Sequence, residues 1–220
     1  MTMMKTALLS FLCFLFLMAP APGARAQHLV PQRGTLLTYK WYSLNGESNL
    51  VLRIRTVQPD FSYTWINTNQ QGQSDSGVFT VSKADMQNAR RVVIGFSQNE
   101  THSDTSCSIL ISKTLCDMIR KDLNKKDSLV HFKVNNSALL DLGNIAYANE
   151  DLIVENEMQA QTHSIALGEI IPGPDFNDLN PDKTIIRFLD DPSFPVITYF
   201  QAPDGDSQLL LVSVTNVQEK

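Results

Sequence analysis

The sequence predicts a mainly β protein, an antiparallel half-barrel, barrel or sandwich that is covered by one amphipathic helix. Three observations support this fold class. Apolar residues alternate with polar ones through many short segments, which is the period of a half-buried strand. Turn-forming residues separate these segments at short intervals, as in sandwiches and barrels. Only residues 112–125 show apolar residues at helical spacing instead.

The first part of the chain predicts an antiparallel meander with strands at 34–44, 48–57 and 61–65. Asn45-Gly46 lies between the first two strands and is the strongest two-residue hairpin signal. We expect residues 67–76 to form a polar loop, because this stretch lacks apolar anchors.

The middle of the chain predicts the helix and the short strands before it. Strands are expected at 78–81, 92–96 and 109–111, and Ser82 is the expected N-cap of a brief helical turn. In the helix 112–125, the residues that share one apolar face are Leu115, Met118, Ile119 and Leu123. An amphipathic helix of this size typically covers an otherwise open sheet.

The remaining strands are expected at 128–134, 152–155, 162–171, 184–189, 196–200 and 208–217. No internal repeat or low-complexity linker interrupts them. Residues 27–220 are therefore expected to form a single domain.

Residues 1–26 have the three parts of a secretory signal peptide. Lys5 provides a basic start, an apolar run of about 13 residues follows, and Ala24-Arg25-Ala26 is a small-x-small cleavage site. The run is shorter than the roughly 20 residues that span a bilayer. An uncleaved membrane anchor is the alternative. The context of Cys13 does not match a lipoprotein signal.

The charge of the mature chain argues against some partners. Removal of Lys5 and Arg25 leaves 16 basic and 23 acidic residues, a formal net charge of −7. Nucleic acids and anionic membranes attract basic surfaces, so neither is an expected partner. We expect a soluble periplasmic or secreted protein.

Two cysteines, Cys107 and Cys116, remain after cleavage. In an oxidising compartment this isolated pair is expected to form a disulfide. A metal site is the alternative, but a zinc site needs further ligands at suitable spacing.

Candidate ligand-binding residues come from the aromatic strands and one histidine. The aromatic candidates for the lining of a cavity are Tyr39, Trp41, Tyr63 and Trp65. His163 is added because it shares a predicted strand face with Ile165 and Leu167. The alternative for all five is that they fill the core or its rim.

One proline-rich loop carries clustered oxygen ligands. Asp175, Asp178 and Asp182, together with Asn180, are weak candidates for calcium ligands. Their spacing does not match an EF-hand, and a rigid surface loop is the alternative. No metal is therefore expected.

The sequence lacks short catalytic signatures. It has no Gly-x-Ser-x-Gly, no His-Glu-x-x-His and no phosphate-binding glycine loop, so neither a catalytic residue nor a cofactor is assigned. Glycosidase carboxylates leave no short signature. Asp141, Glu155 and Glu169 are therefore kept as candidates for an alternative hydrolase.

The segment 111–200 resembles uncharacterised exported bacterial domains. The resemblance lies in the helix start Ser112-Lys113-Thr114-Leu115-Cys116, the strand 129–134 and the hairpin 189–197. Such domains are similar to periplasmic lipoprotein-carrier half-barrels, in which a curved antiparallel sheet wraps an apolar surface under a helix. The resemblance implies this fold and assigns no site residues.

Together these features predict a non-catalytic exported protein that binds an apolar or amphipathic ligand, such as a hydrophobic small molecule or lipid, or an envelope protein. One alternative is a secreted hydrolase that acts on glycans or esters. The other is a scaffold or interaction module of the cell envelope.

Overall fold

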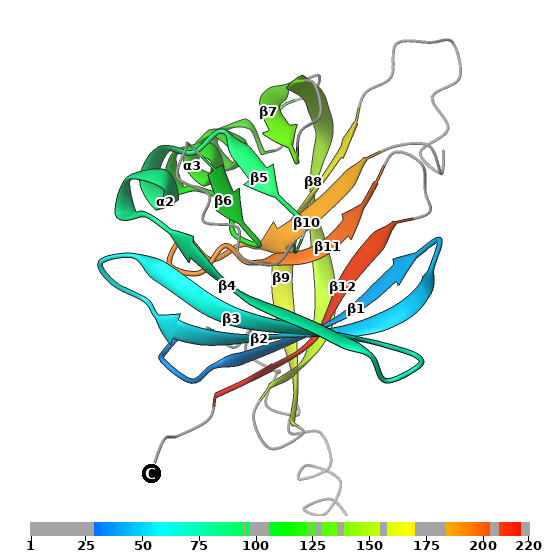
Figure 1. Cartoon of the computed structure of the whole chain (residues 1–220). Coiled ribbons are helices and arrows are strands. Elements are labelled where there is room, and N and C mark those ends of the chain that lie inside the picture. The colour runs from blue at the N-terminus through cyan, green and yellow to red at the C-terminus, as the bar shows by residue number, and fades with distance from the viewer. Residues whose placement is uncertain are drawn as a thin grey trace, which may run out of the picture.

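A computed structural model describes the chain in the following ranges: 29–94, 96, 106–123, 125, 129–135, 139–154, 158–169, 184–202 and 207–216. Twelve strands in these ranges form one mainly antiparallel sheet that curves into a nearly closed barrel (Figure 1). The order of the strands is β4-β3-β2-β1-β12-β11-β10-β9-β8-β7-β5-β6. The edge strands β4 and β6 contact each other, which nearly closes the barrel. The prediction of a mainly β, barrel-like fold is confirmed.

The meander opens the chain with four antiparallel strands, β1 (Leu36–Ser43), β2 (Gly46–Thr56), β3 (Phe61–Asn69) and β4 (Ser74–Val81). The β1–β2 turn consists of Leu44 and Asn45, because Ser43 pairs with Gly46. Gly46, which was expected in the turn, instead begins β2 at a φ of +101° that favours glycine. The polar loop expected at 67–76 is wrong, because β3 and β4 pair through most of this stretch.

Three short strands, β5 (Arg91–Val93), β6 (Ser106–Ser108) and β7 (Val130–Val134), lie at the other end of the sheet order. β5 pairs in parallel with both β6 and β7. The strand expected at 109–111 is wrong, because Ile109 has a φ of +55° that ends β6 just before it. A β-branched residue in this left-handed region marks a backbone held by its surroundings.

The longest hairpin joins β8 (Leu139–Val154) to β9 (Met158–Glu169). Within the first strand of this hairpin, β8, the sequence predicted a strand only at 152–155. The register shifts between Gly143 and Ala146, which interrupts a simple alternation. The far part of β8 also pairs in parallel with β12, where Ser213 lies opposite Ile153. Figure 1 shows the hairpin crossing the meander and extending beyond it.

The barrel is completed by β10 (Ile185–Leu189), β11 (Ile197–Gln201) and β12 (Gln208–Thr215). The last strand pairs antiparallel with both β11 and β1. β1 and β12, the first and last of these strands along the chain, are therefore neighbours in the sheet.

Two helices in the described ranges lie on the β5–β7 side of the barrel (Figure 1), the expected amphipathic helix and the brief helical turn expected after Ser82. These are α2 (Lys83–Asn88) and α3 (Lys113–Asp122). Ser82 caps α2 by accepting a bond from Asp85 N, as predicted. The longer α3 ends three residues before the expected Lys125.

The interior face of the meander is densely packed. The alternation predicted for β2 is confirmed, since Leu50, Leu52 and Ile54 are buried while Arg53 and Arg55 are exposed.

No helix in the described ranges has both the length and the apolar character needed to cross a bilayer.

Candidate functional site

An apolar groove of about 630 Å³ at one end of the barrel is the candidate site. The β2–β3 turn, α2, the segment that leads from β6 into α3, and the β10–β11 connection surround it (Figure 1, left side). Its main apolar lining residues are Phe61, Met86, Leu110, Ile111, Phe194 and Pro195. We call this feature the apolar groove.

Backbone bonds fix the floor of the apolar groove. Leu110 forms a β-bridge with Val196, and Ile111 N donates to Pro195 O at 3.0 Å. The left-handed conformation of Ile109 turns the chain at this point, so that the segment after β6 lies against the β10–β11 connection. Two segments about 85 residues apart in sequence therefore form one surface.

Two lysines lie at the exposed edge of the groove. Lys83 and Lys113 are the first residues of α2 and α3, and both are exposed. The backbone N–H of Lys83 donates to Asp60 Oδ1 at 2.9 Å, which ties α2 to the β2–β3 turn. Both lysines belong to the lining of the groove and carry an ammonium group at the end of a flexible side chain, and the Asp60 carboxylate lies beside the Lys83 backbone. We call these two residues the lysine rim.

Cys107 is a buried part of the groove lining. Its Sγ donates to the backbone oxygen of Asp85 at 3.3 Å. Burial, together with a smaller effect of the Asp85 carboxylate, raises the pKa of the Cys107 thiol to about 12. The thiol is therefore neutral near pH 7, and a neutral thiol is a poor nucleophile.

The predicted Cys107–Cys116 disulfide is wrong, because both cysteines are free in the structure. Each thiol is instead buried, Cys107 against α2 and Cys116 on the inner face of α3. Burial is also the main cause that raises the pKa of Cys116, to about 11. Sequence spacing alone does not show whether two cysteine side chains face each other.

The two tyrosines that were named as candidates for a cavity lining are buried in the core, as in the alternative interpretation. The hydroxyl of Tyr39 donates to Ile197 O at 2.9 Å, which connects β1 to β11. The hydroxyl oxygens of Tyr63 and Ser108 are 2.7 Å apart, which connects β3 to β6. Burial raises the pKa of both tyrosines. Neither residue lines the apolar groove.

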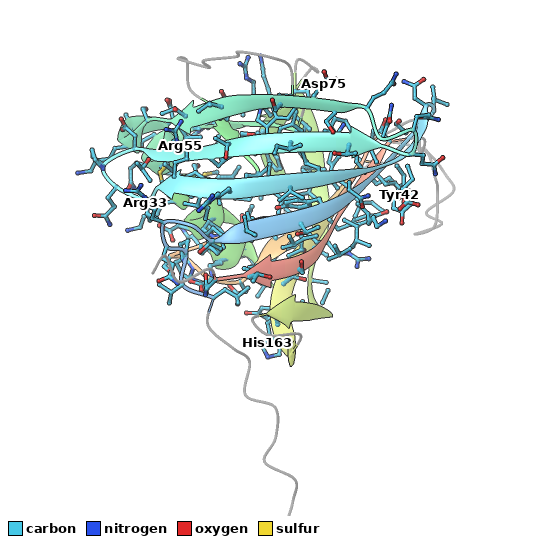
Figure 2. The ribbon with its side chains drawn as sticks, turned by 60° about the horizontal axis from the view of Figure 1, so that its bottom comes forward. Arg33, Tyr42, Arg55, Asp75 and His163 are labelled. Atoms are coloured by element: carbon cyan, nitrogen blue, oxygen red, sulfur yellow. The ribbon has the colours of Figure 1, made fainter. Side chains whose placement is uncertain are left out.

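The other predicted cavity residues lie outside the groove as well. Trp65 is buried, Trp41 is partly buried, and both indoles contact Phe96 with ring centroids 5.7 and 5.8 Å away. His163 is exposed on β9, and Figure 2 shows it on the part of the hairpin that extends beyond the meander. It therefore does not share the interior with the aromatic residues.

The predicted calcium candidates Asp175, Asp178 and Asp182 lie outside the described residues. The same holds for Glu155 and for the side chains of Asp141 and Glu169. Among the residues that are described, no group of three or more His, Cys, Asp or Glu side chains is arranged to hold a metal ion.

Sequence reasoning did not single out the groove residues. Their signal was present in two turns that pair proline with an aromatic residue, Pro59 before Phe61 and Phe194 before Pro195. These turns were interpreted only as chain reversals. Nothing in the sequence shows that the two turns meet.

The fold and the site together define a barrel-shaped β protein with an apolar, lysine-rimmed groove at one end. Comparison of the chain with known protein families, curated proteins and solved structures found no match. The function is therefore argued from the groove itself.

Proposed function

We propose that this chain is a non-catalytic exported binding protein, periplasmic or secreted, and that its apolar groove holds an amphipathic molecule with an anionic head. Export is inferred from residues 1–26, and the binding role from the groove. The resemblance of residues 111–200 to carrier half-barrels agrees with the same proposal.

The observation that carries the proposal is the combination of an apolar floor with the lysine rim. A volume of about 630 Å³ lies within the range of small-molecule sites, roughly 300–1,000 Å³. The floor favours an acyl or similarly apolar body, because burial of such a body removes apolar surface from water. Lys83 and Lys113 favour a carboxylate or phosphate at the mouth of the groove.

The chemistry of the groove supports binding more than reaction. Cys107, the thiol in the lining, is held neutral by burial. The described side chains of the lining otherwise supply apolar contacts, amides, the two ammonium groups and the hydroxyl of Ser193, which donates to Asp191 Oδ1 at 2.7 Å. These groups suit recognition of a ligand without a covalent step.

The test is fluorescence titration of the purified protein with a dansylated fatty acid and with the corresponding uncharged alcohol. Met86→Asp places a charge in the groove and should weaken binding of both probes about tenfold or more. Met118→Asp is the matched control, since Met118 lies on α3 outside the groove and is 37% exposed. This control should bind as the unmodified protein does.

The lysine rim is tested separately with the variant Lys83→Glu/Lys113→Glu. It should lower affinity for the acid and leave affinity for the alcohol unchanged, because only the acid has a head group for the lysines. Lys121→Glu, an exposed position on α3, is the charge control. Failure of both probes to bind, or equal losses in Met86→Asp and Met118→Asp, would contradict the proposal. Turnover of a chromogenic ester or glycoside would favour a hydrolase instead.

A further inference from the structure

An acidic residue lies at the mouth of the apolar groove, beside the lysine rim. Asp60 is exposed in the β2–β3 turn, and its two neighbours in sequence, Pro59 and Phe61, both line the groove. Its Oδ1 accepts the backbone N–H of Lys83 at 2.9 Å. The mouth of the groove, on the left side of the barrel in Figure 1, therefore carries a carboxylate as well as ammonium groups.

Hydrogen bonds hold Asp60 in place at both its backbone and its side chain. Thr56 Oγ1 donates to Asp60 O at 3.0 Å and lies 2.6 Å from Ser62 Oγ, which fixes the β2–β3 turn. The bond from Lys83 N connects the carboxylate to the start of α2. A group that is already ordered loses little conformational freedom when a ligand binds to it. Asp60 is therefore well suited to contact the head of a ligand.

The charge of Asp60 is open to a ligand. The group that donates to its Oδ1 is a neutral N–H, and no described lysine or arginine forms an ion pair with it. Two other acids near the groove, Asp85 and Asp191, are only 8% and 9% exposed. They accept bonds from the hydroxyls of Ser82 and Ser193. These two carboxylates serve the packing of the protein, whereas Asp60 faces water.

We infer that the preferred ligand of the apolar groove has a zwitterionic head group, a phosphate next to a primary ammonium, on one apolar chain. This inference rests on the proposed function, because it specifies the head of the same amphipathic ligand. The lysine rim pairs with the phosphate, and Asp60 accepts hydrogen bonds from the ammonium. A purely anionic head would meet repulsion from Asp60, whereas a zwitterionic head complements both signs of charge at the mouth.

The mouth of the groove favours a primary ammonium over a quaternary one. A primary ammonium has three N–H donors for a carboxylate, and a quaternary ammonium has none. Quaternary groups are instead recognised by the faces of aromatic rings. Phe61 and Phe194 are the aromatic residues of the described lining, and each is only 1% exposed. The contact with the cation therefore comes from Asp60.

The test is displacement of the dansylated fatty acid by two decanoyl lipids, lysophosphatidylethanolamine and lysophosphatidylcholine. They carry the same chain, phosphate and net charge, so the lysine rim interacts with both alike. The ethanolamine lipid should displace the probe at a concentration about two- to fivefold lower, the range expected for an exposed ion pair. Asp60→Asn keeps an oxygen that accepts the Lys83 N–H but removes the charge. It should make the two lipids equally effective.

The charge control is Asp75→Asn, an exposed position on β4 outside the groove, which should keep the preference for the ethanolamine lipid. The fatty acid should bind Asp60→Asn at least as tightly as it binds the unmodified protein, which also shows that this variant is folded. The inference is overturned if both lipids displace the probe equally from the unmodified protein, or if Asp60→Asn retains the preference. Failure of the fatty acid itself to bind would instead refute the proposed function.

Discussion

The meander β1–β4 and the strands β5, β6 and β7 belong to the same sheet, but different information in the sequence specifies them. In the meander each strand pairs antiparallel with the next one along the chain. In the second region β5 pairs in parallel with both β6 and β7, and α3 lies between β6 and β7 along the chain. The first arrangement depends on local alternation and turns, and the second depends on contacts that are distant in sequence.

Particular side chains show this dependence in the second region. Asn135, at a φ of +53°, accepts a bond from Ile94 N through its Oδ1 at 2.6 Å. Ser112 donates to Ala89 O at 2.6 Å, which ties the start of α3 to the end of α2. The comparison teaches that alternation identifies a strand when its partner is adjacent in sequence. It does not identify a parallel partner.

The largest expected effect concerns the core of the meander. Trp65→Ala should lower the free energy of unfolding by about 3–5 kcal/mol, because Trp65 is almost completely buried. Gly77→Ala should cost about 1–3 kcal/mol, since its Cβ would lie 2.7 Å from Trp65 Nε1. Urea denaturation measures both. Gly168→Ala, whose Cβ would meet no atom within 4 Å, is the control.

The second effect concerns the two thiols beside the helices and depends on pH. Their folded pKa values are raised above the ordinary 9.0, to about 12 for Cys107 and about 11 for Cys116. The folded state therefore favours the neutral thiols. The free energy of unfolding is unaffected by thiol ionisation below pH 9, and it falls as the pH rises from 9 towards 11–12. By pH 11 the loss should be roughly 2 kcal/mol for each thiol.

Urea denaturation between pH 7 and pH 11 measures this decline. The variant Cys107→Ala/Cys116→Ala should show a smaller decline, although buried tyrosines contribute to what remains. An equal decline in the variant would contradict the prediction.

A separate experiment tests whether the two thiols are free. Alkylation in urea without a reductant should label both cysteines, and protection of both would indicate a disulfide.

The third effect concerns the hydrogen bond between Tyr63 and Ser108, which joins β3 of the meander to β6 where the barrel closes. Tyr63→Phe should cost about 1–3 kcal/mol, because Ser108 is left buried without its partner. Adding Ser108→Ala should recover part of this loss. A double-mutant cycle measured by urea denaturation gives the coupling. Additive losses would show that the Tyr63–Ser108 bond does not stabilise the closure.

A smaller effect concerns the helix caps of the second region. Ser112 accepts a bond from Leu115 N at 3.2 Å, so Ser112→Ala should cost about 1 kcal/mol or somewhat more. The additional bond to Ala89 O adds to this loss. Ser82→Ala removes the cap of the shorter α2 and should cost less. Thermal unfolding followed by circular dichroism ranks the two variants, and the reverse order would contradict the expectation.

The smallest effect concerns an ion pair on the surface of the meander. Lys40 and Glu47 form an ion pair between β1 and β2, and both side chains are about one-third exposed. Lys40→Gln should leave the free energy of unfolding nearly unchanged, and high salt should reduce any difference from the unmodified protein. Urea denaturation at low and high salt measures it. A larger, salt-independent loss would show that the pair is important to the hairpin.

The sequence was sufficient for the fold class and for the inward face of the meander, because alternating residues such as Leu50, Leu52 and Ile54 carry that signal locally. It was not sufficient to predict the parallel pairing of β5 with β7, or to show that the two cysteines are buried as free thiols. The apolar groove also escaped sequence reasoning, since Phe61 and Phe194 meet only after the barrel curves. The aromatic candidates Tyr39, Tyr63 and Trp65 are buried in the core, which the sequence analysis kept as the alternative to a cavity lining.

The pairing of β1 with β12 has a consequence for folding kinetics. Tyr39 lies beside Leu211 in this pair, so the contact joins residues 172 positions apart. Such long-range pairing requires closure of a large loop, and proteins dominated by it acquire their native structure in milliseconds to seconds or more slowly. Until β12 emerges from the ribosome, β1 lacks one of its two partners. The closed barrel therefore forms only after the last strand of the chain is available to pair with the first.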